Sequence, residues 1–321
     1  MYNHAIRVRG VIIMTLKGKD FLTLHDFSGQ EIVDMVDLGI ELKQKQKAGI
    51  PTPILAGKTL GMIFQKSSTR TRVSFEVGMY QLGGQALYLN ANDLQIGRGE
   101  PIQDTARVLS RYVDGILIRT FSHQEVEDLA KYADVPVING LTDDYHPTQV
   151  IADLITIKEH KGTLAGMKLA YVGDGNNMTH SLMIGCAKVG MEIRVATPKG
   201  YEADAKIVQA AQEYAAQYGG KVVITNDPQE AVNGVDIIYT DTWASMGQEA
   251  EKEERKKAFA GYQVDRAMMK LAKEDAIFMH CLPAYRGMEV TEEVLEGAQS
   301  VVFDEAENRL HAHKAIMATL M

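Results

Sequence analysis

Short apolar runs rich in β-branched residues alternate with longer helical patterns along almost the whole chain, and this alternation constrains the fold most. Apolar strands separated by helices are typical of parallel sheets that are covered on both faces. The pattern therefore predicts a doubly wound α/β architecture. We expect strands at 60–64, 115–118, 135–138, 169–172, 192–195, 221–224, 236–239, 277–279 and 301–303. The helical patterns between them include 30–48, 71–82, 101–112, 147–160, 181–189 and 201–218.

The length of 321 residues suggests two domains, because one domain typically takes about 150 residues. No Pro/Gly/Ser-rich linker separates them, so the boundary must lie inside a helix or a turn. We place it at the helix expected over 147–160. A last helix, expected over 307–320, precedes no further strand, and the pattern allows it to pack on either half.

Charge and cysteine content exclude several classes of protein. The formal net charge of −8 argues against a broad nucleic-acid-binding surface, and no stretch approaches the roughly 20 apolar residues of a membrane helix. Only Cys186 and Cys281 occur, which excludes a disulfide framework and indicates a reducing compartment. We therefore expect a cytoplasmic protein. Residues 1–13 are interpreted as an extension ahead of Met14, with a clipped organelle presequence as the alternative.

Ligands of doubly wound sheets bind at the carboxyl ends of the strands, so the polar residues after each strand are informative. The run 65–72 (QKSSTRTR) follows the strand expected at 60–64 and precedes a helix. The start of a helix attracts anions, hydroxyl groups add donors, and the fork of Arg70 suits a phosphate group. Plain N-capping needs one hydroxyl and explains neither arginine in the run. The run therefore predicts an anion site.

Two further polar groups follow strands in the first half. Arg119 comes after the strand at 115–118, although a lone arginine in this position is most often a surface residue. His146 and Gln149 flank Pro147, which suits the first turn of a helix. A neutral histidine there donates to a carbonyl oxygen, and a glutamine amide offers both a donor and an acceptor. A polar helix start that binds nothing is the alternative.

The second half contains one motif that resembles a dinucleotide site and does not qualify. Gly173 and Gly175 follow a strand, but Met178 stands where the third small residue is required. The next strand also ends without an acidic residue to hold a ribose. We therefore reject nucleotide binding.

Two more strand ends carry polar residues. Asp241 lies on a loop with Ser245, suited to hold an ammonium group, and the charged run 249–257 that follows is interpreted as a solvated helix face. Cys281 follows the strand at 277–279, where a cysteine is usually a small buried apolar residue. No cluster of His, Cys and Asp has the spacing of a zinc site, so we predict no metal.

Together these motifs resemble the aspartate/ornithine carbamoyltransferase family. Ser68-Thr69-Arg70-Thr71 and His146-Pro147-x-Gln149 resemble the family's carbamoyl-phosphate signatures. Asp241-x-x-x-Ser245-Met246-Gly247 and His280-Cys281-Leu282-Pro283 are similar to the branch of the family that uses ornithine. The motifs occur in order from about Leu22 onwards, and the set is far more specific than any one member.

The resemblance implies a role for each matching residue. It implies Arg119, His146 and Cys281 as catalytic residues, with Cys281 and the Leu282 carbonyl beside the reacting amine and the Leu282–Pro283 peptide typically cis. Ornithine would be bound by Asn177, Asp241, Ser245 and Met246. Gln95 would reach the site of a neighbouring subunit in a homotrimer with shared active sites. The implied carbamoyl-phosphate ligands are Ser68, Thr69, Arg70, Thr71, Gln95, Arg119, His146, Gln149, Cys281, Leu282 and Arg309.

The resemblance also implies the architecture and the reaction. We expect a carbamoyl-phosphate-binding domain over 1–150, an ornithine-binding domain over 151–306, and a C-terminal helix over about 307–321 that returns to the first domain. The implied reaction is carbamoyl transfer to L-ornithine, which gives citrulline in arginine biosynthesis or a urea-cycle type step, with no cofactor or metal. The alternatives are another amine acceptor (putrescine, aspartate or N-acetylornithine) and a catalytically silent phosphate-binding regulator.

Overall fold

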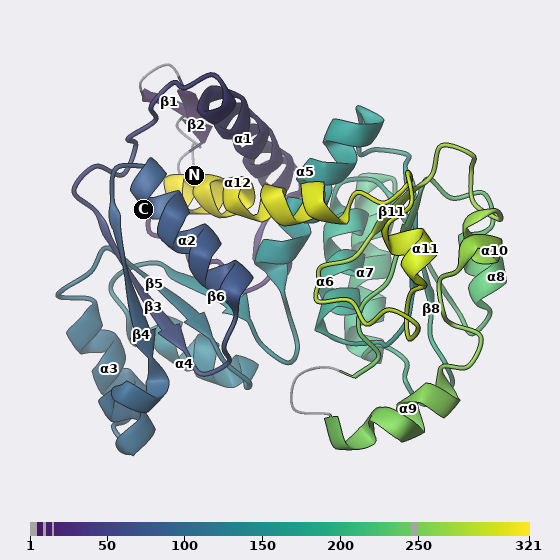
Figure 1. Cartoon of the computed structure of the whole chain (residues 1–321). Coiled ribbons are helices and arrows are strands. Elements are labelled where there is room, and N and C mark those ends of the chain that lie inside the picture. Colours follow the sequence, from purple (N-terminus) through teal and green to yellow (C-terminus); the bar gives the residue numbers. More distant parts are fainter. Residues whose placement is uncertain (1–4, 9–10, 15, 245–248) are drawn as a thin grey trace. The chain divides into compact units, whose positions relative to one another are not determined.

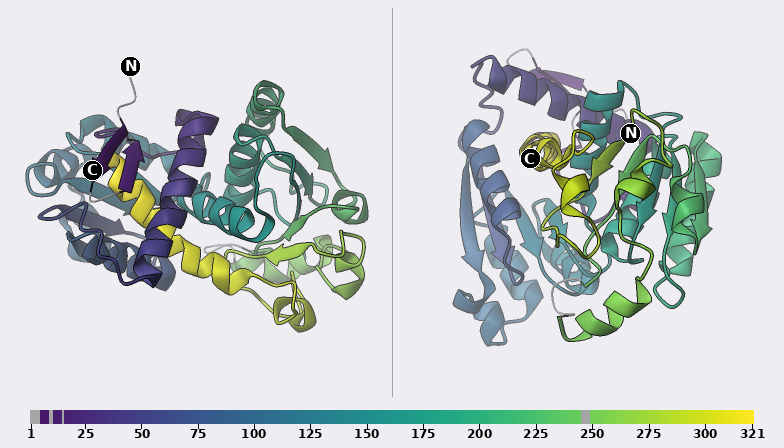
Figure 2. Two further views of the ribbon diagram at one scale, coloured as in Figure 1. Left: turned by 90° about the horizontal axis from the view of Figure 1, so that it is seen from above. Right: turned by 45° about the vertical axis from the view of Figure 1, so that its right-hand side comes forward.

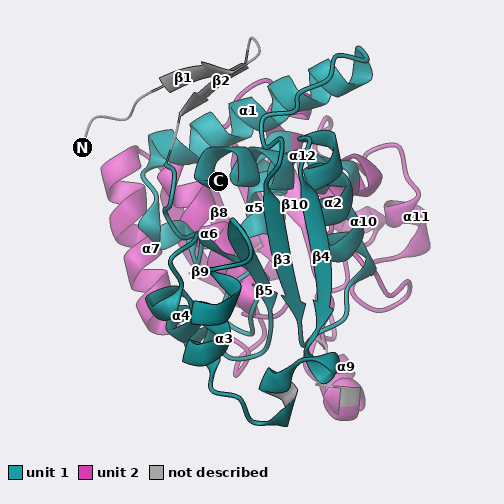
Figure 3. Cartoon of the chain, turned by 90° about the vertical axis from the view of Figure 1, so that its left-hand side faces the viewer, with its two compact units in different colours: residues 1–155, 307–321 teal, residues 156–306 magenta. Residues whose placement is uncertain are grey.

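The chain forms two compact units, each with its own parallel sheet flanked by helices, as the alternating pattern predicts. The structure is a computed structural model, and it describes residues 5–8, 11–14, 16–244 and 249–321. Unit 1 comprises Met1–Ile155 and Glu307–Met321, and unit 2 comprises Thr156–Ala306 (Figure 3). The chain passes from one unit to the other inside two helices, α5 (Pro147–Lys161) and α12 (Val302–Leu320) (Figure 1).

The sheet of unit 1 has the order β4-β3-β5-β6, and all of its strands are parallel. The chain runs from β3 outward to β4 and then returns to the other side of β3 for β5. This leaves a topological switch point between β3 and β5, which is where ligands of such sheets bind. The strands are β3 (Thr59–Phe64), β4 (Gln85–Asn90), β5 (Gly115–Arg119) and β6 (Val137–Leu141).

Helices α3 and α4 share an apolar core with one face of this sheet, formed by side chains such as Ile63, Ile118 and Leu129. Helix α1 begins with a capping box, in which Ser28 and Glu31 each bind the other's backbone N–H. The antiparallel strands β1 and β2 precede it, and β2 lies against α1. The remaining elements are β1 (Ala5–Val8), β2 (Val11–Met14), α1 (Gly29–Lys47), α2 (Thr69–Gln81), α3 (Ile102–Leu109) and α4 (His123–Tyr132), with short 3-10 helices η1 (Leu24–Asp26), η2 (Ala91–Asp93) and η3 (Gln95–Arg98).

Helix α12 brings residues 307–321 back into unit 1, where it passes against α1 and α2 (Figure 2). The Lys43 ammonium group on α1 donates to Asn308 Oδ1 over 2.8 Å. On α2, Gly78 permits close packing, because a Cβ atom there would lie 3.0 Å from the Met317 side chain. At the C-terminus of α12, a carbonyl group accepts a hydrogen bond from the segment before α1, because the amide of Leu16 donates to the Thr319 carbonyl. The sequence pattern allowed the last helix to pack on either half of the chain, and in the structure residues 307–321 pack on unit 1.

The sheet of unit 2 has the order β11-β10-β7-β8-β9 and is also fully parallel. The chain builds β7, β8 and β9 in one direction and then returns to place β10 and β11 on the other side of β7. The switch point therefore lies between β7 and β10. The strands are β7 (Lys168–Val172), β8 (Glu192–Ala196), β9 (Lys221–Thr225), β10 (Ile237–Tyr239) and β11 (Ile277–Met279).

One face of this sheet packs on a large apolar core that contains Trp243, Phe259 and Phe278. Helix α6 is almost wholly buried and packs on α7. Among the described residues, no helix combines the length and the apolar character that a membrane crossing requires. The helices of unit 2 are α6 (Asn177–Lys188), α7 (Ala205–Tyr218), α8 (Pro228–Val232), α9 (Lys252–Ala258), α10 (Arg266–Met269) and α11 (Glu292–Leu295), with the 3-10 helix η4 (Glu249–Glu251).

Two differences from the sequence prediction have physical reasons. The prediction of a strand at 301–303 is wrong, because Val302 and Phe303 form the first turn of α12. The sequence pattern also missed β4, an edge strand in which none of the residues is fully buried.

Candidate functional site

In unit 1 the turn between β3 and α2 opens at the switch point of the sheet. The backbone amides of Gln65 and Lys66 both donate to the Arg119 carbonyl, over 2.9 and 3.3 Å, so the turn is tied to the end of β5. Helix α2 then begins at Thr69, with Ser68 Oγ as its cap accepting from the Thr71 amide over 3.2 Å. The first N–H groups of α2 therefore lie at the carboxyl end of the sheet, where a helix start attracts an anion.

Arginine side chains from three separate segments surround the buried His146 (4 % exposed). Burial lowers the pKa of His146 well below its usual range, and the positive charges of Arg309, Arg119 and Arg70 lower it further. Arg309 also donates from Nη2 to Thr71 Oγ1 over 2.8 Å, which joins α12 to the first turn of α2. The result is a neutral imidazole, a hydrogen-bond donor without charge, among fixed positive charges.

Gln149 lies in the first turn of α5, fully buried, one turn before Asp153. Its amide nitrogen donates to Asp153 Oδ1 over 2.8 Å, which fixes the orientation of the amide. The sequence did not single out Asp153, because its only signal is the spacing of four residues along a helix.

In unit 2 the carboxylate of Asp241 is held at the ends of three neighbouring strands. Its Oδ1 accepts from the Thr242 amide over 2.7 Å and from Cys281 Sγ over 3.2 Å. Its Oδ2 accepts from Asn176 Nδ2 over 3.1 Å. These partners come from the segments after β10, β11 and β7, so the switch point of this sheet presents a fixed negative charge beside a thiol.

Asn176, to which the sequence assigned no role, binds the predicted site residue Asp241. Its side-chain oxygen caps α6 by accepting from the amides of Met178 and Thr179, while its nitrogen holds Asp241. Asn177 is then the first residue of the helix and is half-buried. A cap of this kind is a common helix start, and only the fold shows that it also orients the carboxylate.

The charged run 249–257 is largely a solvated face, as predicted, because the charged residues described from Glu251 to Lys257 are exposed, and Arg255 is the exception. Its side chain is buried on α9 and donates from Nη1 to Asp174 Oδ2 over 2.8 Å and to the Trp243 carbonyl over 2.9 Å. Burial raises the pKa of Asp174 to about 6, and the guanidinium of Arg255 opposes that rise. Arg255 thus joins the segments on either side of residues 245–248 to the end of β7.

The backbone after β11 turns sharply. Leu282 has φ of +57°, which a non-glycine residue seldom adopts, and the Leu282–Pro283 peptide is cis, as the resemblance implied. Cys281 and Leu282 are both half-buried. The turn presents the Cys281 thiol beside Asp241.

Asp241, His280 and Cys281 each offer one atom that could bind a metal ion, and these three atoms lie within 4.8 Å of one another. The spacing of these residues in the sequence did not predict this cluster. Hydrogen bonds within unit 2 account for the arrangement. Cys281 donates to Asp241, while the two ring nitrogens of His280 bond to the Leu282 amide and to Glu289.

The fold distributes the predicted residues between the two units. Gln95 is exposed on η3, in the segment that follows the edge strand β4. The predicted residues Ser245 and Met246 lie outside the described residues. Unit 1 holds Ser68, Thr69, Arg70, Thr71, Gln95, Arg119, His146, Gln149 and Arg309, and unit 2 holds Asn177, Asp241, Cys281 and Leu282.

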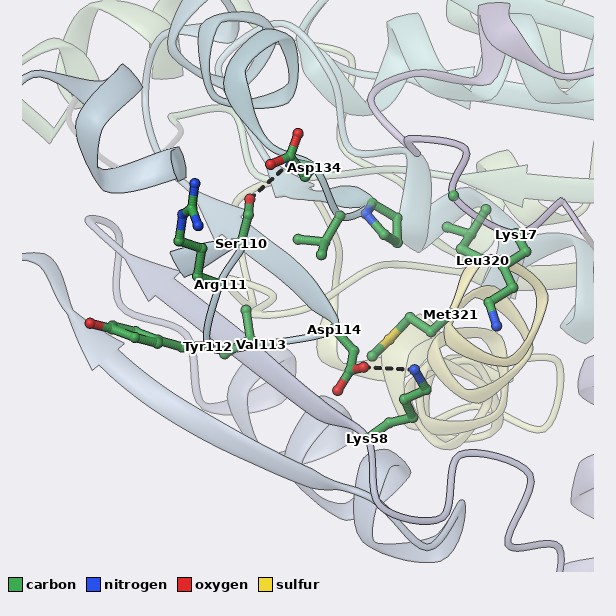
Figure 4. Close-up of a pocket in the computed structure, with 13 residues that line it drawn as sticks. Lys17, Lys58, Ser110, Arg111, Tyr112, Val113, Asp114, Asp134, Leu320 and Met321 are labelled. Atoms are coloured by element: carbon green, nitrogen blue, oxygen red, sulfur yellow. Dashed lines mark hydrogen bonds and ion pairs between the residues drawn. The ribbon is translucent and has the colours of Figure 1, made fainter. Parts of the chain in front are cut away.

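A cavity of about 460 Å³ lies elsewhere in unit 1 (Figure 4). Lys58, Asp114 and Pro136 line it, and each directly precedes a strand, so the cavity is at the amino ends of the strands. Lys58 is paired with Asp114 over 2.6 Å. The cavity is therefore at the end of the sheet opposite to the predicted anion site.

Family models match both halves of the chain. Residues 19–159 match the carbamoyl-P binding domain of aspartate/ornithine carbamoyltransferase, and residues 165–320 match its Asp/Orn binding domain. The chain belongs to the aspartate/ornithine carbamoyltransferase family. The membership assigns the switch point of unit 1 to the half of the family fold named for carbamoyl phosphate, and that of unit 2 to the half named for the amino acid.

Several similar members of this family are ornithine carbamoyltransferases. Ornithine carbamoyltransferase of Carboxydothermus hydrogenoformans is 64 % identical over 310 residues, covering 97 % of this chain and all of that protein. A solved ornithine carbamoyltransferase from Pyrococcus furiosus is 58 % identical with a TM-score of 0.94, covering 96 % of this chain and 99 % of that one. An anabolic ornithine carbamoyltransferase from Campylobacter jejuni is 46 % identical with a TM-score of 0.88, covering 93 % and 97 %.

Proposed function

We propose that this chain transfers the carbamoyl group of carbamoyl phosphate to the δ-amine of L-ornithine, giving L-citrulline and phosphate. Relatives at 58–64 % identity over almost the whole chain bear the name ornithine carbamoyltransferase. The observation that carries the choice of acceptor is the carboxylate of Asp241, fixed beside the Cys281 thiol at the switch point of unit 2. A fixed carboxylate suits an acceptor that carries an ammonium group. We place the reaction in arginine biosynthesis.

Carbamoyl phosphate binds to unit 1 in this proposal. Ser68, Thr69 and Thr71 offer hydroxyl and amide donors at the start of α2, and Arg70 and Arg309 supply charge for the phosphate. Arg119, His146 and Gln149 hold the carbamoyl end. Because His146 is neutral, it donates a hydrogen bond to the carbonyl oxygen without adding to the positive charge around it.

Ornithine binds to unit 2. Asn177 binds the α-carboxylate, and Asp241 binds the α-ammonium group together with Ser245 and Met246. Asp241 suits this role because three hydrogen bonds hold its carboxylate in one orientation. Cys281 and the Leu282 carbonyl lie beside the reacting amine.

The chemistry follows from these assignments. The neutral δ-amine attacks the carbamoyl carbon, the carbonyl oxygen gains negative charge, and phosphate leaves. Arg119 and His146 stabilise the charge on that oxygen as the donors of an oxyanion hole do. Free ornithine carries a protonated δ-amine, so binding must favour the neutral form. Cys281 is a polar neighbour of the amine in this mechanism and forms no covalent intermediate.

The active form in this proposal is a homotrimer, in which Gln95 of one subunit reaches the site of the next. Two features of unit 1 support an interface beside η3. Gln95 is exposed, and apolar side chains are exposed on α2 and on the edge strand β4 that precedes η3. Exposed apolar groups on neighbouring elements, such as α2 and β4, favour burial against a partner. They are Val73, Val77, Tyr80 and Leu87.

The test is citrulline formation from carbamoyl phosphate and ornithine, with putrescine, aspartate and N-acetylornithine assayed in parallel. We expect turnover with ornithine alone. Turnover only with another amine would retain the assignments in unit 1 and overturn those of Asn177 and Asp241. Binding of carbamoyl phosphate without any turnover would favour a silent regulator.

Variants then separate the two subsites. Asp241→Asn is expected to raise the KM for ornithine by about 10- to 100-fold, because it removes the negative charge. Arg309→Lys is expected to raise the KM for carbamoyl phosphate by a similar factor, because it keeps the positive charge but loses the planar fork of donors. Arg266→Lys is the matched control, since Arg266 is exposed and pairs with Glu293. Equal changes in both KM values for either variant would contradict separate subsites.

A further inference from the structure

A buried histidine and two buried carboxylates lie directly behind the turn that carries Cys281 and Leu282. His280, Glu289 and Glu305 each have no exposed surface. The proposed mechanism uses none of them. Buried polar groups of this kind are costly unless they hold one another or a neighbouring segment in place.

His280 binds the backbone on both sides of the turn. Its amide donates to Glu305 Oε2 over 2.9 Å, which fixes the point where the chain leaves β11. Its ring atom Nδ1 lies 2.9 Å from the Leu282 nitrogen and accepts from that N–H group. A ring nitrogen that accepts a hydrogen bond carries no proton, so the proton of His280 must be on Nε2.

Glu289 enforces that tautomer. Its Oε1 lies 3.3 Å from His280 Nε2, and a carboxylate oxygen that faces a ring nitrogen accepts a hydrogen bond from it. Nε2 must therefore carry the proton, which leaves Nδ1 available to the Leu282 amide. The same oxygen accepts from the Tyr285 amide over 2.5 Å, so the carboxylate is itself held in position.

The bond between Leu282 and His280 matters because of the backbone at Leu282. A leucine at φ of +57° is strained and persists only where its surroundings enforce the conformation. The acceptor on His280 Nδ1 is one such constraint, since it binds the N–H group of the strained residue itself. This bond therefore helps to hold the directions of the Leu282 carbonyl and of the Cys281 thiol, which also donates to Asp241.

We propose that Glu289 is a positioning residue for carbamoyl transfer, acting through the tautomer of His280 to hold the Leu282 carbonyl and the Cys281 thiol toward the reacting amine. The proposal rests on the proposed function, because that function places the δ-amine beside these two groups. Glu289 itself contacts neither substrate in this scheme. The competing explanation is that Glu289 only folds the segment after Pro283 through the Tyr285 amide.

Glu289→Gln is the first variant, because the glutamine amide keeps the size of the side chain but can donate as well as accept. It allows the other tautomer of His280, in which Nδ1–H faces the Leu282 N–H and their hydrogen bond is lost. We expect kcat to fall about 10- to 100-fold, as a small misplacement of reacting groups does, with the KM for carbamoyl phosphate unchanged. Glu296→Gln is the control, since Glu296 is exposed and pairs with Arg286. A wild-type kcat in Glu289→Gln would overturn the proposal.

A double-mutant cycle separates the two explanations. In His280→Asn the side-chain oxygen takes the place of Nδ1 and accepts from the Leu282 amide without needing Glu289. If Glu289 acts through His280, adding Glu289→Gln to His280→Asn lowers kcat less than twofold. The full loss in the double variant would show that Glu289 acts only on the segment after Pro283.

A spectroscopic measurement covers the case in which a variant fails to fold. In wild-type protein labelled with 15N-histidine, the His280 resonances, identified by their loss in His280→Asn, should show a protonated Nε2 and an unprotonated Nδ1. The opposite tautomer would overturn the proposal. This readout needs no turnover, so an absence of citrulline formation by the wild type would count against the proposed function alone.

Discussion

Lys314 on α12 offers a quantitative test of the packing in unit 1. Its side chain is 1 % exposed, and its ammonium group donates to Gln81 Oε1 on α2 over 2.9 Å. Burial lowers the pKa of Lys314 from 10.5 to about 8. The folded protein therefore binds this proton less tightly than the unfolded chain does, and the charged lysine opposes folding.

The size of this effect follows from the pKa. At about 1.4 kcal/mol per pH unit, a pKa that falls from 10.5 to about 8 corresponds to about 3 kcal/mol. The full cost applies below pH 8, where both states are charged. Between pH 8 and 10.5 the folded protein loses the proton first, so this group makes the free energy of unfolding rise with pH. Above pH 10.5 the cost is gone.

Lys314→Met removes the charge and keeps the unbranched chain that packs near Gly78. The loss of the hydrogen bond to Gln81 costs about 1 kcal/mol of the roughly 3 kcal/mol that is gained by removing the buried charge. We therefore expect a net stabilisation of about 2 kcal/mol at pH 7. For a unit of this size that corresponds to a rise in Tm of about 4–8 °C. Thermal and urea unfolding followed by circular dichroism at pH 7 and pH 10 measure it, with exposed Lys131→Met as the matched control. The reasoning is refuted if the variant is less stable at pH 7, or if its advantage does not shrink at pH 10.

Three further predictions concern unit 2. Arg255→Met leaves Asp174 buried without its guanidinium partner, so we expect a loss of about 3–5 kcal/mol in urea unfolding and a higher KM for ornithine; an unchanged midpoint would contradict this. Cys281→Ala should lower kcat about tenfold without abolishing it, as the loss of one hydrogen bond does, whereas a carbamoyl-cysteine adduct found by mass spectrometry would overturn its role as a polar neighbour. Gly175→Ala places a Cβ atom 2.2 Å from the Ala203 nitrogen, so we expect about 1–3 kcal/mol of destabilisation in thermal unfolding, and wild-type stability would argue against so close an approach.

The sequence predicts the doubly wound architecture well because buried parallel strands leave a local signal. The run 115–118 is apolar throughout, and β5 is buried along its whole length. The same signal misled at 301–303, where apolar Val302 is buried in the first turn of a helix. A short apolar run does not by itself distinguish a strand from a helix. The residues on either side of the run must decide.

The candidate site was predictable where polar residues directly follow a strand or begin a helix. Ser68 caps α2, Arg119 ends β5 and Asp241 lies two residues after β10, and the family resemblance adds their proposed roles. Arg255 and Glu289 were not predictable in this way, because their partners are distant in sequence or hidden by an ordinary charged segment. The contacts of Arg255 depend on how the strands of unit 2 are ordered, which local patterns do not encode, whereas the partners of Glu289 lie in the segment after β11.

The return of α12 to unit 1 has a consequence for how the chain folds during synthesis. Residues 307–321 are translated after all of unit 2, yet they supply Arg309, and their last turn accepts hydrogen bonds from residues 16–18. Unit 2 is continuous over Thr156–Ala306, so all of its residues are synthesised before those that complete unit 1. Unit 1 starts first and finishes last, and until α12 arrives the apolar flank of α2 has no cover. Nascent chains stalled between the two stages should therefore be the form of this protein that most needs a chaperone.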